Sequence, residues 1–168
     1  FKELLPKVAQ ACREHRHDIA RQNAELRQSL ALSAPAPQAG AEPGPAPLAS
    51  ALSQLKQRFD PVHGGFGGAP KFPRPSEIAF CLRRHAAEGV GPALEMARQT
   101  LRKIADGGIY DQLGGGFCRY SVDERWLIPH FEKMLYDNGP LLELYADAWR
   151  ITGDERFRTV AEETVAWL

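Results

Sequence analysis

The sequence predicts an all-α fold made of helical pairs, with one long structured loop between them. Three observations lead to this prediction. Apolar residues recur with the 3.6-residue period of amphipathic helices along most of the chain. Glycine and proline stand at the ends of these periodic segments, where helices stop and start. No segment alternates apolar and polar residues over a length that would support a sheet of any size.

The composition is that of a globular protein and argues against several function classes. Of the 168 residues, 43% are hydrophobic and 25% are charged, and 21 Lys plus Arg balance 21 Asp plus Glu. This balance offers no basic surface for nucleic acid. No apolar run approaches the ~20 residues of a membrane helix, and no secretory leader is recognisable. The three cysteines form no C-x-x-C pair, so we expect reduced thiols in a cytoplasmic protein.

The first expected element is one long amphipathic helix over residues 1–30, because its apolar residues fall on one stripe. Residues 33–47 follow as a Pro/Ala-rich linker with five prolines, which fix φ and remove backbone donors. Since the chain begins at Phe1 and ends at Leu168, both inside apolar patterns, we expect it to be a piece of a longer protein.

The pattern of residues 48–59 predicts a short helix, and that of the segment FDPVHGGFGGAPKFPRP (59–75) predicts a loop. Four glycines surround Phe66 in this loop and three prolines follow it, which rules out regular structure. The glycines match neither the G-x-G-x-x-G nor the G-x-x-x-x-G-K-[ST] phosphate-binding pattern.

A pair of antiparallel helices is expected next. Ser76 is a suitable N-cap for a helix that ends near Glu88, with Gly89 as its stop. Pro92 stands in the first turn of a second helix that runs to Asp106. The short connection between them places the two helices side by side.

Residues 108–128 interrupt the helical pattern and predict a Gly-rich loop or short β-hairpin, with extended structure favoured at 117–122. The helical period resumes at Pro129 and continues to about Thr152. Gly153 stops this helix, and Asp154 caps a last helix that extends toward the C-terminus.

The expected helix at 129–152 carries polar residues on its apolar side. His130, Asp137 and Asn138 fall within the sector that holds Leu141, Tyr145 and other apolar residues. Burying such groups without partners costs roughly 1–3 kcal/mol each. Two interpretations stay open: a pocket over the helix N-terminus, or a buried polar network that fixes the packing of this segment.

Aromatic residues concentrate in the same region. Six of the fifteen lie between Ile109 and Asp137: Tyr110, Phe117, Tyr120, Trp126, Phe131 and Tyr136. Charged residues stand beside them at Asp111, Arg119, Asp123, Glu132 and Asp137. Aromatic faces stack on the C–H faces of sugars, while carboxylates and Arg bind hydroxyls, and a carboxylate pair can act as acid and base. Any single aromatic residue is nevertheless more often part of a core.

Other chemistries have weaker support. His130 has no second histidine at a ligand spacing, so no metal site is predicted, and nothing in the sequence calls for a cofactor. Ser121 and Asp123 do not lie on a G-x-S-x-G turn. A redox role would need a low-pKa thiol at Cys118, beside Arg119.

Three motifs carry a resemblance to a known family: GGFGGAPKFPRP (64–75), GGIYDQLGGGFCRYSVDERW (107–126) and PHFEKMLYDN (129–138). The chain resembles the thioredoxin-domain-containing, spermatogenesis-associated protein 20-like family over most of its length outside the linker. The resemblance implies an incomplete (α/α) toroid of about three helical hairpins. This toroid is of the six-hairpin glycosidase type, similar to N-acylglucosamine 2-epimerase domains. Where relatives often carry His, this chain has Cys118.

The resemblance also implies a domain layout. Residues 1–32 would be a junction helix following a thioredoxin-like domain, residues 33–47 the linker, and residues 48–168 the opening hairpins of the toroid. The implied partners are that thioredoxin-like domain and a sugar or other small-molecule ligand, with no nucleic acid and no membrane.

The function expected is a carbohydrate-active domain, epimerase-like or glycosidase-like, that uses acid/base chemistry. The catalytic candidates are His130, Asp137 and Asp111, since an imidazole with its ordinary pKa of about 6.5 exchanges protons near neutrality. The substrate-binding candidates are Arg119, Tyr120, Trp126, Glu132, Tyr136 and Asn138. The alternative is a non-catalytic binding or scaffold module attached to the thioredoxin-like domain.

Overall fold

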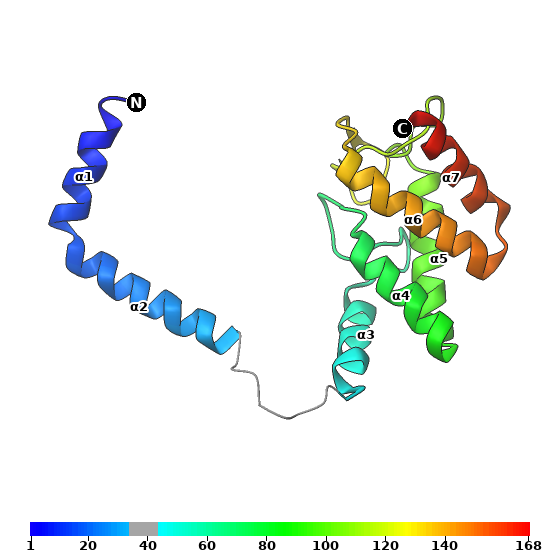
Figure 1. Cartoon of the computed structure of the whole chain (residues 1–168), viewed down its shortest axis with the longest axis horizontal. Helices are drawn as coiled ribbons and strands as arrows, with labels where there is room; N and C mark the ends of the chain where they lie inside the picture. Colours follow the sequence, from blue (N-terminus) through cyan, green and yellow to red (C-terminus); the bar gives the residue numbers. More distant parts are fainter. Residues whose placement is uncertain (34–43) are drawn as a thin grey trace. The chain divides into compact units, whose positions relative to one another are not determined.

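The computed structural model describes residues 1–33 and 44–168, which belong to two separate units (Figure 1). Most of the predicted linker, residues 34–43, lies outside the described residues. Its last residues belong instead to the first helix of the second unit, α3 (Ala46–Arg58), in which Pro47 occupies the first turn. The linker prediction therefore extended too far, because proline is well tolerated at a helix start.

The first unit contains two helices, α1 (Leu4–Glu14) and α2 (Arg16–Ser33), where the sequence predicted one. They meet at His15, whose φ of −107° and ψ of 26° leave the helical region. Every residue from 1 to 33 is exposed, including the whole predicted apolar stripe. Within this unit α1 and α2 bury none of their residues, so no packing inside the unit holds a single helix straight across His15.

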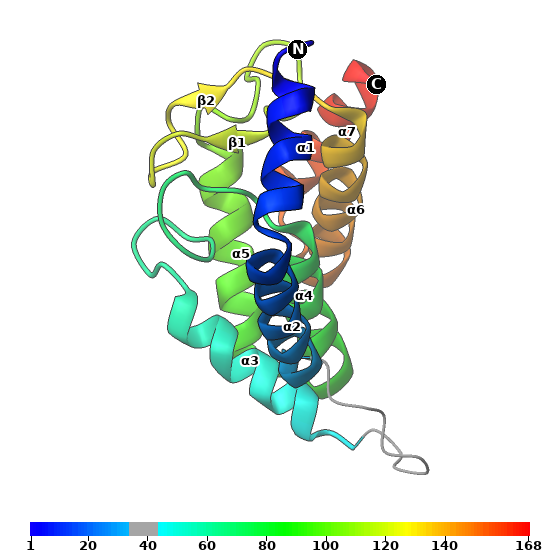
Figure 2. The same cartoon turned by 90° about the vertical axis from the view of Figure 1, so that its left-hand side faces the viewer.

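The second unit confirms the all-α prediction. Two antiparallel hairpins follow α3: α4 (Pro75–Glu88) with α5 (Gly91–Ala105), and α6 (Leu135–Thr152) with α7 (Glu155–Trp167). Between them lies a two-stranded antiparallel ribbon of β1 (Tyr120–Ser121) and β2 (Pro129–His130). Of the two predicted alternatives it matches the short β-hairpin, but its second strand lies past the predicted range of 108–128. Figure 2 shows this ribbon at the end of the bundle where α6 begins.

The residues predicted to end or cap the helices are confirmed, except for the predicted N-cap Ser76. Gly89 and Gly153 both adopt left-handed backbone conformations, with φ of 69° and 68°, and the Asp154 side chain accepts a hydrogen bond from the Arg156 N–H. The N-cap of α4 is Arg74 and not Ser76. Pro75 takes the first helical position, where its missing N–H costs nothing, so Ser76 lies inside the helix.

The two hairpins pack through α4 and α6, which run in the same direction (Figure 1). Their N-terminal halves lie side by side, and α5 and α7 cover the other side. The largest buried side chains of the helices are Ile78, Leu101, Ile104, Leu141, Tyr145 and Phe157. The long loops 59–74 and 106–134 close the end where α4 and α6 begin. None of the helices in the described ranges has the length and apolar character needed to cross a bilayer.

Helix α6 begins at Leu135, six residues later than the sequence predicted. Residues Pro129 and His130 pair with β1, in a register that sets Tyr120 opposite His130. The pairing continues past the ribbon, since the Arg119 N–H donates to the Glu132 carbonyl at 2.9 Å. These ladder bonds hold the backbone extended through Met134. Phe131, assigned to the apolar stripe, is consequently 84% exposed.

A buried lysine ties the two long loops together. The Lys71 side chain is fully buried, with its Nζ atom 2.6 Å from Asp60 Oδ2 and 3.0 Å from the Glu124 carbonyl oxygen. Its backbone exchanges two hydrogen bonds with Ser121, at 2.7 and 2.9 Å. The ammonium lies 5.3 Å from the centre of the Trp126 ring. One side chain therefore anchors the 59–74 loop to the 106–134 loop.

Two glycines allow the second loop to approach the end of α5. A Cβ at Gly107 would lie 2.5 Å from the Trp126 carbonyl oxygen, and one at Gly108 would lie 2.1 Å from that of Leu127. These distances are too short for any side chain. The Gly107-Gly108 pair therefore follows the end of α5 and leaves room for the backbone of Trp126 and Leu127 to pack there.

We expect Asp60→Asn to destabilise the protein by about 3 kcal/mol, because it leaves the fully buried Lys71 ammonium without its counter-charge. Lys71→Met should cost less, roughly 1–2 kcal/mol, since the Asp60 carboxylate is 21% exposed and keeps hydrogen bonds from the N–H groups of Val62 and His63. Urea unfolding of both variants measures the difference. Asp147→Asn, which removes an exposed ion pair with Arg150, is the control and should change stability by less than about 0.5 kcal/mol.

The ion pair of Lys71 and Asp60 also makes the stability of the protein depend on pH. Burial opposes ionisation of Asp60, but the His63 N–H, the Lys71 ammonium and the Val62 N–H together lower its pKa below the ordinary 3.8. The stability that ionised Asp60 contributes is therefore fully present above pH 3.8, and it is lost as the pH falls through the lowered pKa of Asp60. The gap between wild type and Asp60→Asn should narrow below pH 4; a constant gap would contradict an ionised pair.

Candidate functional site

The ribbon and the loop before α4 build a stack of three rings. Tyr120 lies between Phe72 and His130, at centroid distances of 4.6 and 4.7 Å and interplanar angles of 25° and 16°. Tyr120 and His130 face each other because they are register partners in the ribbon. Phe72 joins them because its neighbour Lys71 is bonded to Ser121. The His130 side chain remains 42% exposed, so the stack presents a partly open aromatic surface.

Charged side chains gather beside this stack. Arg119 stands between two carboxylates: its Nη1 lies 3.7 Å from Glu132 Oε2 and its Nε lies 3.7 Å from Asp137 Oδ2. Its guanidinium carbon is 5.7 Å from the centre of the Tyr136 ring, and His130 Nδ1 is 3.6 Å from Glu132 Oε2. The structure therefore brings six predicted site residues together, which we name the loop-end cluster: Arg119, Tyr120, His130, Glu132, Tyr136 and Asp137.

The loop-end cluster has unused hydrogen-bonding capacity. His130 Nδ1 and Asp137 Oδ2 are buried atoms without a hydrogen-bond partner among the described residues. The contacts around Arg119 are close enough for charge attraction but longer than a hydrogen bond. Buried polar atoms are satisfied in most proteins, so each exception requires an explanation. These side chains therefore retain capacity for a further hydrogen-bonding partner.

The surroundings of Asp137 oppose its ionisation relative to a free carboxyl. Burial raises the pKa of this carboxyl, Arg119 acts to lower it, and the negative charge of Glu132 raises it further, so that the pKa lies above the ordinary 3.8. The side chain is still 28% exposed. A partly accessible carboxyl with a raised pKa is suited to proton transfer.

Asn138, the next residue along α6, has a different role. Its Oδ1 accepts the Phe117 N–H at 2.6 Å, and its Nδ2 donates to the carbonyl oxygens of Phe117 and Met134 at 2.9 and 3.0 Å. The side chain is fully buried. For Asn138, then, the structure matches the interpretation of a polar network that fixes packing, and its amide is occupied by protein groups.

Two further candidates lie outside the loop-end cluster. Trp126 was expected at a pocket mouth but is fully buried, and its Nε1 donates to the His63 carbonyl at 2.8 Å, which corrects that expectation. Asp111 forms an ion pair with Lys133 and accepts the N–H groups of Gly114 and Leu113. These contacts lower the pKa of Asp111 to about 2, so it is ionised at neutral pH.

The redox alternative at Cys118 is wrong for this structure. The thiol is buried, and burial raises its pKa, although Lys133 acts in the opposite direction. A raised pKa leaves the sulfur as an unreactive thiol at neutral pH. Among the described residues, no group of His, Cys, Asp and Glu side chains is arranged to hold a metal ion.

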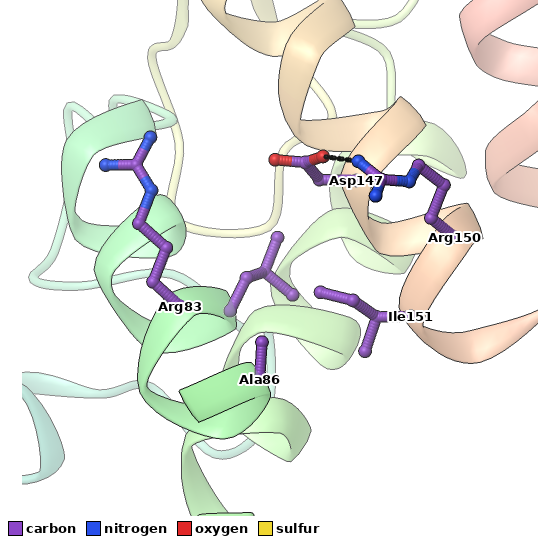
Figure 3. A pocket seen from close by; sticks show the side chains of 6 residues that line it. Arg83, Ala86, Asp147, Arg150 and Ile151 are labelled. Carbon is purple, nitrogen blue, oxygen red and sulfur yellow. Dashed lines mark hydrogen bonds and ion pairs between the residues drawn. The ribbon is translucent and has the colours of Figure 1, made fainter. Parts of the chain in front are cut away.

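Two hollows follow the line between α4 and α6. The first, of about 430 Å³, adjoins the loop-end cluster and includes Tyr136 and Asp137 in its wall. The second, of about 230 Å³, lies further along the helices between Ala86 of α4 and Ile151 of α6 (Figure 3). Arg83 belongs to the lining of both. The site is therefore a half-open cluster with a groove leading away from it.

Sequence comparison relates the chain to much longer proteins. It is 45% identical over 115 residues to spermatogenesis-associated protein 20 of Rattus norvegicus and 43% identical over 115 residues to that of Homo sapiens. Each match covers 66% of this chain and 15% of the relative, so the chain spans about a seventh of the length of these curated relatives. No protein-family model matches the chain.

Structure comparison identifies the architecture. A cellobiose 2-epimerase from Bacillus thermoamylovorans superimposes with a TM-score of 0.61 at 13% identity, covering 71% of this chain and 35% of that one. A sugar epimerase from a ruminal bacterium gives 0.58 at 16% identity, covering 70% and 35%. At such identities the likeness shows the fold alone, and it confirms the expected partial (α/α) toroid. Sequence and fold together relate this chain to spermatogenesis-associated protein 20 and its homologues, with the (α/α) toroid architecture of the 2-epimerases.

Proposed function

We propose that this chain carries part of a carbohydrate site that works by acid/base chemistry, with the loop-end cluster as its centre. The observation that supports this most directly is the unused hydrogen-bonding capacity of His130, Asp137 and Arg119 beside a partly open aromatic stack. The likeness to sugar epimerases adds support from the fold.

The chemistry of the loop-end cluster matches a sugar ring. Sugar hydroxyls both donate and accept hydrogen bonds, so they can pair with the Arg119 donors and with Asp137 Oδ2 together. The exposed edges of the Phe72–Tyr120–His130 stack offer apolar contact for C–H groups. Polar and aromatic groups in this combination are the usual composition of a small-molecule site.

The proton-transfer roles fall on two residues. An epimerase-type reaction removes a proton from the carbon next to a carbonyl and returns one on the opposite face, which requires a base and an acid. We assign these roles to His130 and Asp137, the two titratable groups of the loop-end cluster that have unpartnered buried atoms. Arg119 would polarise the sugar oxygen and Glu132 would orient His130. Asp111, held by Lys133, would not take part directly.

Binding is tested by titrating the ¹⁵N-labelled chain with cellobiose and following the Arg119 and Tyr120 signals by NMR. We expect the wild type to respond and His130→Phe to bind at least about tenfold more weakly, because a phenyl ring keeps the stack but lacks Nδ1. His17→Phe, in α2, is the matched control and should bind like the wild type. Equal responses from both variants, or none from the wild type, would refute the carbohydrate site.

Acid/base chemistry is tested by incubating cellobiose with the chain in D₂O. We expect deuterium to replace the hydrogen at C2 of the reducing sugar, because a proton taken by the protein exchanges with solvent before it returns. Asp137→Asn should reduce this exchange by at least about 100-fold, the usual contribution of a positioned acid or base. Proton NMR of the sugar measures it, and an undiminished rate in Asp137→Asn would remove that residue from the mechanism.

The rival function, a scaffold that binds a protein partner, has one observation in its favour. Four apolar side chains are exposed on or beside the ribbon loop: Val122, Leu127, Ile128 and Phe131. Exposed apolar patches mark protein contacts. If a thioredoxin-fold domain binds here, as the family resemblance suggests, NMR titration with such a domain should broaden the Ile128 and Phe131 signals.

A matched pair of variants separates this rival from the carbohydrate site. Phe131→Ser should abolish the response to the thioredoxin-fold domain, while Leu113→Ser, which changes an equally exposed apolar residue on another turn, should leave it intact. A response that survives in Phe131→Ser would count against the scaffold, as would no response in the wild type.

A further inference from the structure

The hollow between the N-terminal halves of α4 and α6 lies directly beside the loop-end cluster. We infer that it receives the second ring of a disaccharide whose first ring is bound at His130 and Arg119. This inference rests on the proposed function and names its substrate class: a saccharide of at least two units, as opposed to a monosaccharide.

The lining of the hollow is suited to a sugar ring. Its apolar surface comes from Pro75 and Ala79 of α4 and from Pro140 and Leu144 of α6. Polar groups from Ser76, Arg83 and Glu143 stand at its edge. Pyranose rings have C–H faces bounded by hydroxyls, so an apolar floor with a polar edge is complementary to them. The volume of about 430 Å³ lies within the range of small-molecule sites.

The hollow and the loop-end cluster share a wall. Asp137 lines the hollow and also lies 3.7 Å from Arg119. Tyr136 likewise lines the hollow and lies beside the Arg119 guanidinium. A ligand held by Arg119 therefore reaches the hollow without crossing a gap, and the glycosidic oxygen of a disaccharide would lie near Asp137.

The far end of the hollow offers free polar groups to the second ring. Arg83 and Glu143 face each other there across the two helices at 3.6 Å, beyond hydrogen-bond distance, so both retain capacity for sugar hydroxyls. The second hollow, which lies past Arg83, has about half the volume of the first. Figure 3 shows that two of its charged groups pair with each other, with Arg150 Nη1 3.3 Å from Asp147 Oδ1.

The experiment compares glucose with cellobiose, using methyl-labelled alanine in the wild-type chain. We expect both sugars to shift the Arg119 signals and only cellobiose to shift the Ala79 methyl, with about tenfold tighter binding for cellobiose. The Ala86 methyl lines the second hollow and should not respond to either sugar. This measurement needs no variant and does not depend on how a substitution folds.

A pair of substitutions on the same face of α4 tests the inference further. Ala79→Leu fills the first hollow and should reduce cellobiose affinity to that of glucose while leaving glucose binding unchanged. Ala86→Leu, two turns along the helix, fills the second hollow and should leave the tenfold preference intact. Circular dichroism confirms that each variant is folded.

The outcomes separate the inference from the function on which it rests. Equal affinity for both sugars with no shift at Ala79 would overturn the disaccharide subsite and leave the carbohydrate site standing. No response to either sugar would overturn both. Shifts at Ala79 on adding a thioredoxin-fold domain, without a sugar response, would identify the hollow as part of a protein contact.

Discussion

The burial of the Lys71 ammonium is the constraint on which the site depends. A charge removed from water must find a counter-charge and further acceptors, and Lys71 finds them in Asp60 and in the Glu124 carbonyl. These two partners come from separate loops, which are therefore held in one arrangement. The backbone of Lys71 adds two bonds to Ser121 in β1. The next residue, Phe72, is then positioned against Tyr120 and completes the ring stack. A buried ion pair contributes little net stability but strongly disfavours other arrangements of the loops.

A second constraint operates at the start of α6, where two neighbouring residues have opposite roles. Both polar atoms of the Asn138 side chain are hydrogen-bonded to the backbone of Phe117 and Met134, and these bonds fix the helix end to the loop. Asp137 lies about 100° around the same turn and keeps one buried oxygen unbonded. The first residue thus supplies the rigidity that the second requires, since a carboxyl on a mobile helix end would not keep the burial that raises its pKa.

The sequence predicted the helical scaffold well because its signals are local. Gly89 and Gly153 end helices by their own backbone preference, and Asp154 caps by its own side chain. The start of α6 could not be predicted in the same way. Residues 129–134 satisfy a helical period, but ladder bonds to residues 119–120, about ten positions earlier, hold them extended.

The roles of individual site residues depend on long-range contacts in the same manner. Composition alone does not distinguish Trp126, which is buried, from Tyr120, which is partly open. Lys71 was missed altogether, because its partners lie 11 residues before it and 53 residues after it. The only local signal was a single charged residue in GGAPKFP, a segment otherwise without charge.

The looseness of the loop-end cluster is informative because tight ion pairs occur on the same loops. Lys71 approaches Asp60 to 2.6 Å, and Lys133 approaches Asp111 equally closely. These segments can therefore bring opposite charges to hydrogen-bond distance where packing requires it. At Arg119, Asp137, Glu132 and His130 the separations stay at 3.6–3.7 Å, although the groups are of the same kinds. Each unmade hydrogen bond at a buried polar atom, such as His130 Nδ1 or Asp137 Oδ2, costs free energy. Separation of these groups beside an open aromatic stack is compatible with a site in which the missing partner is a ligand.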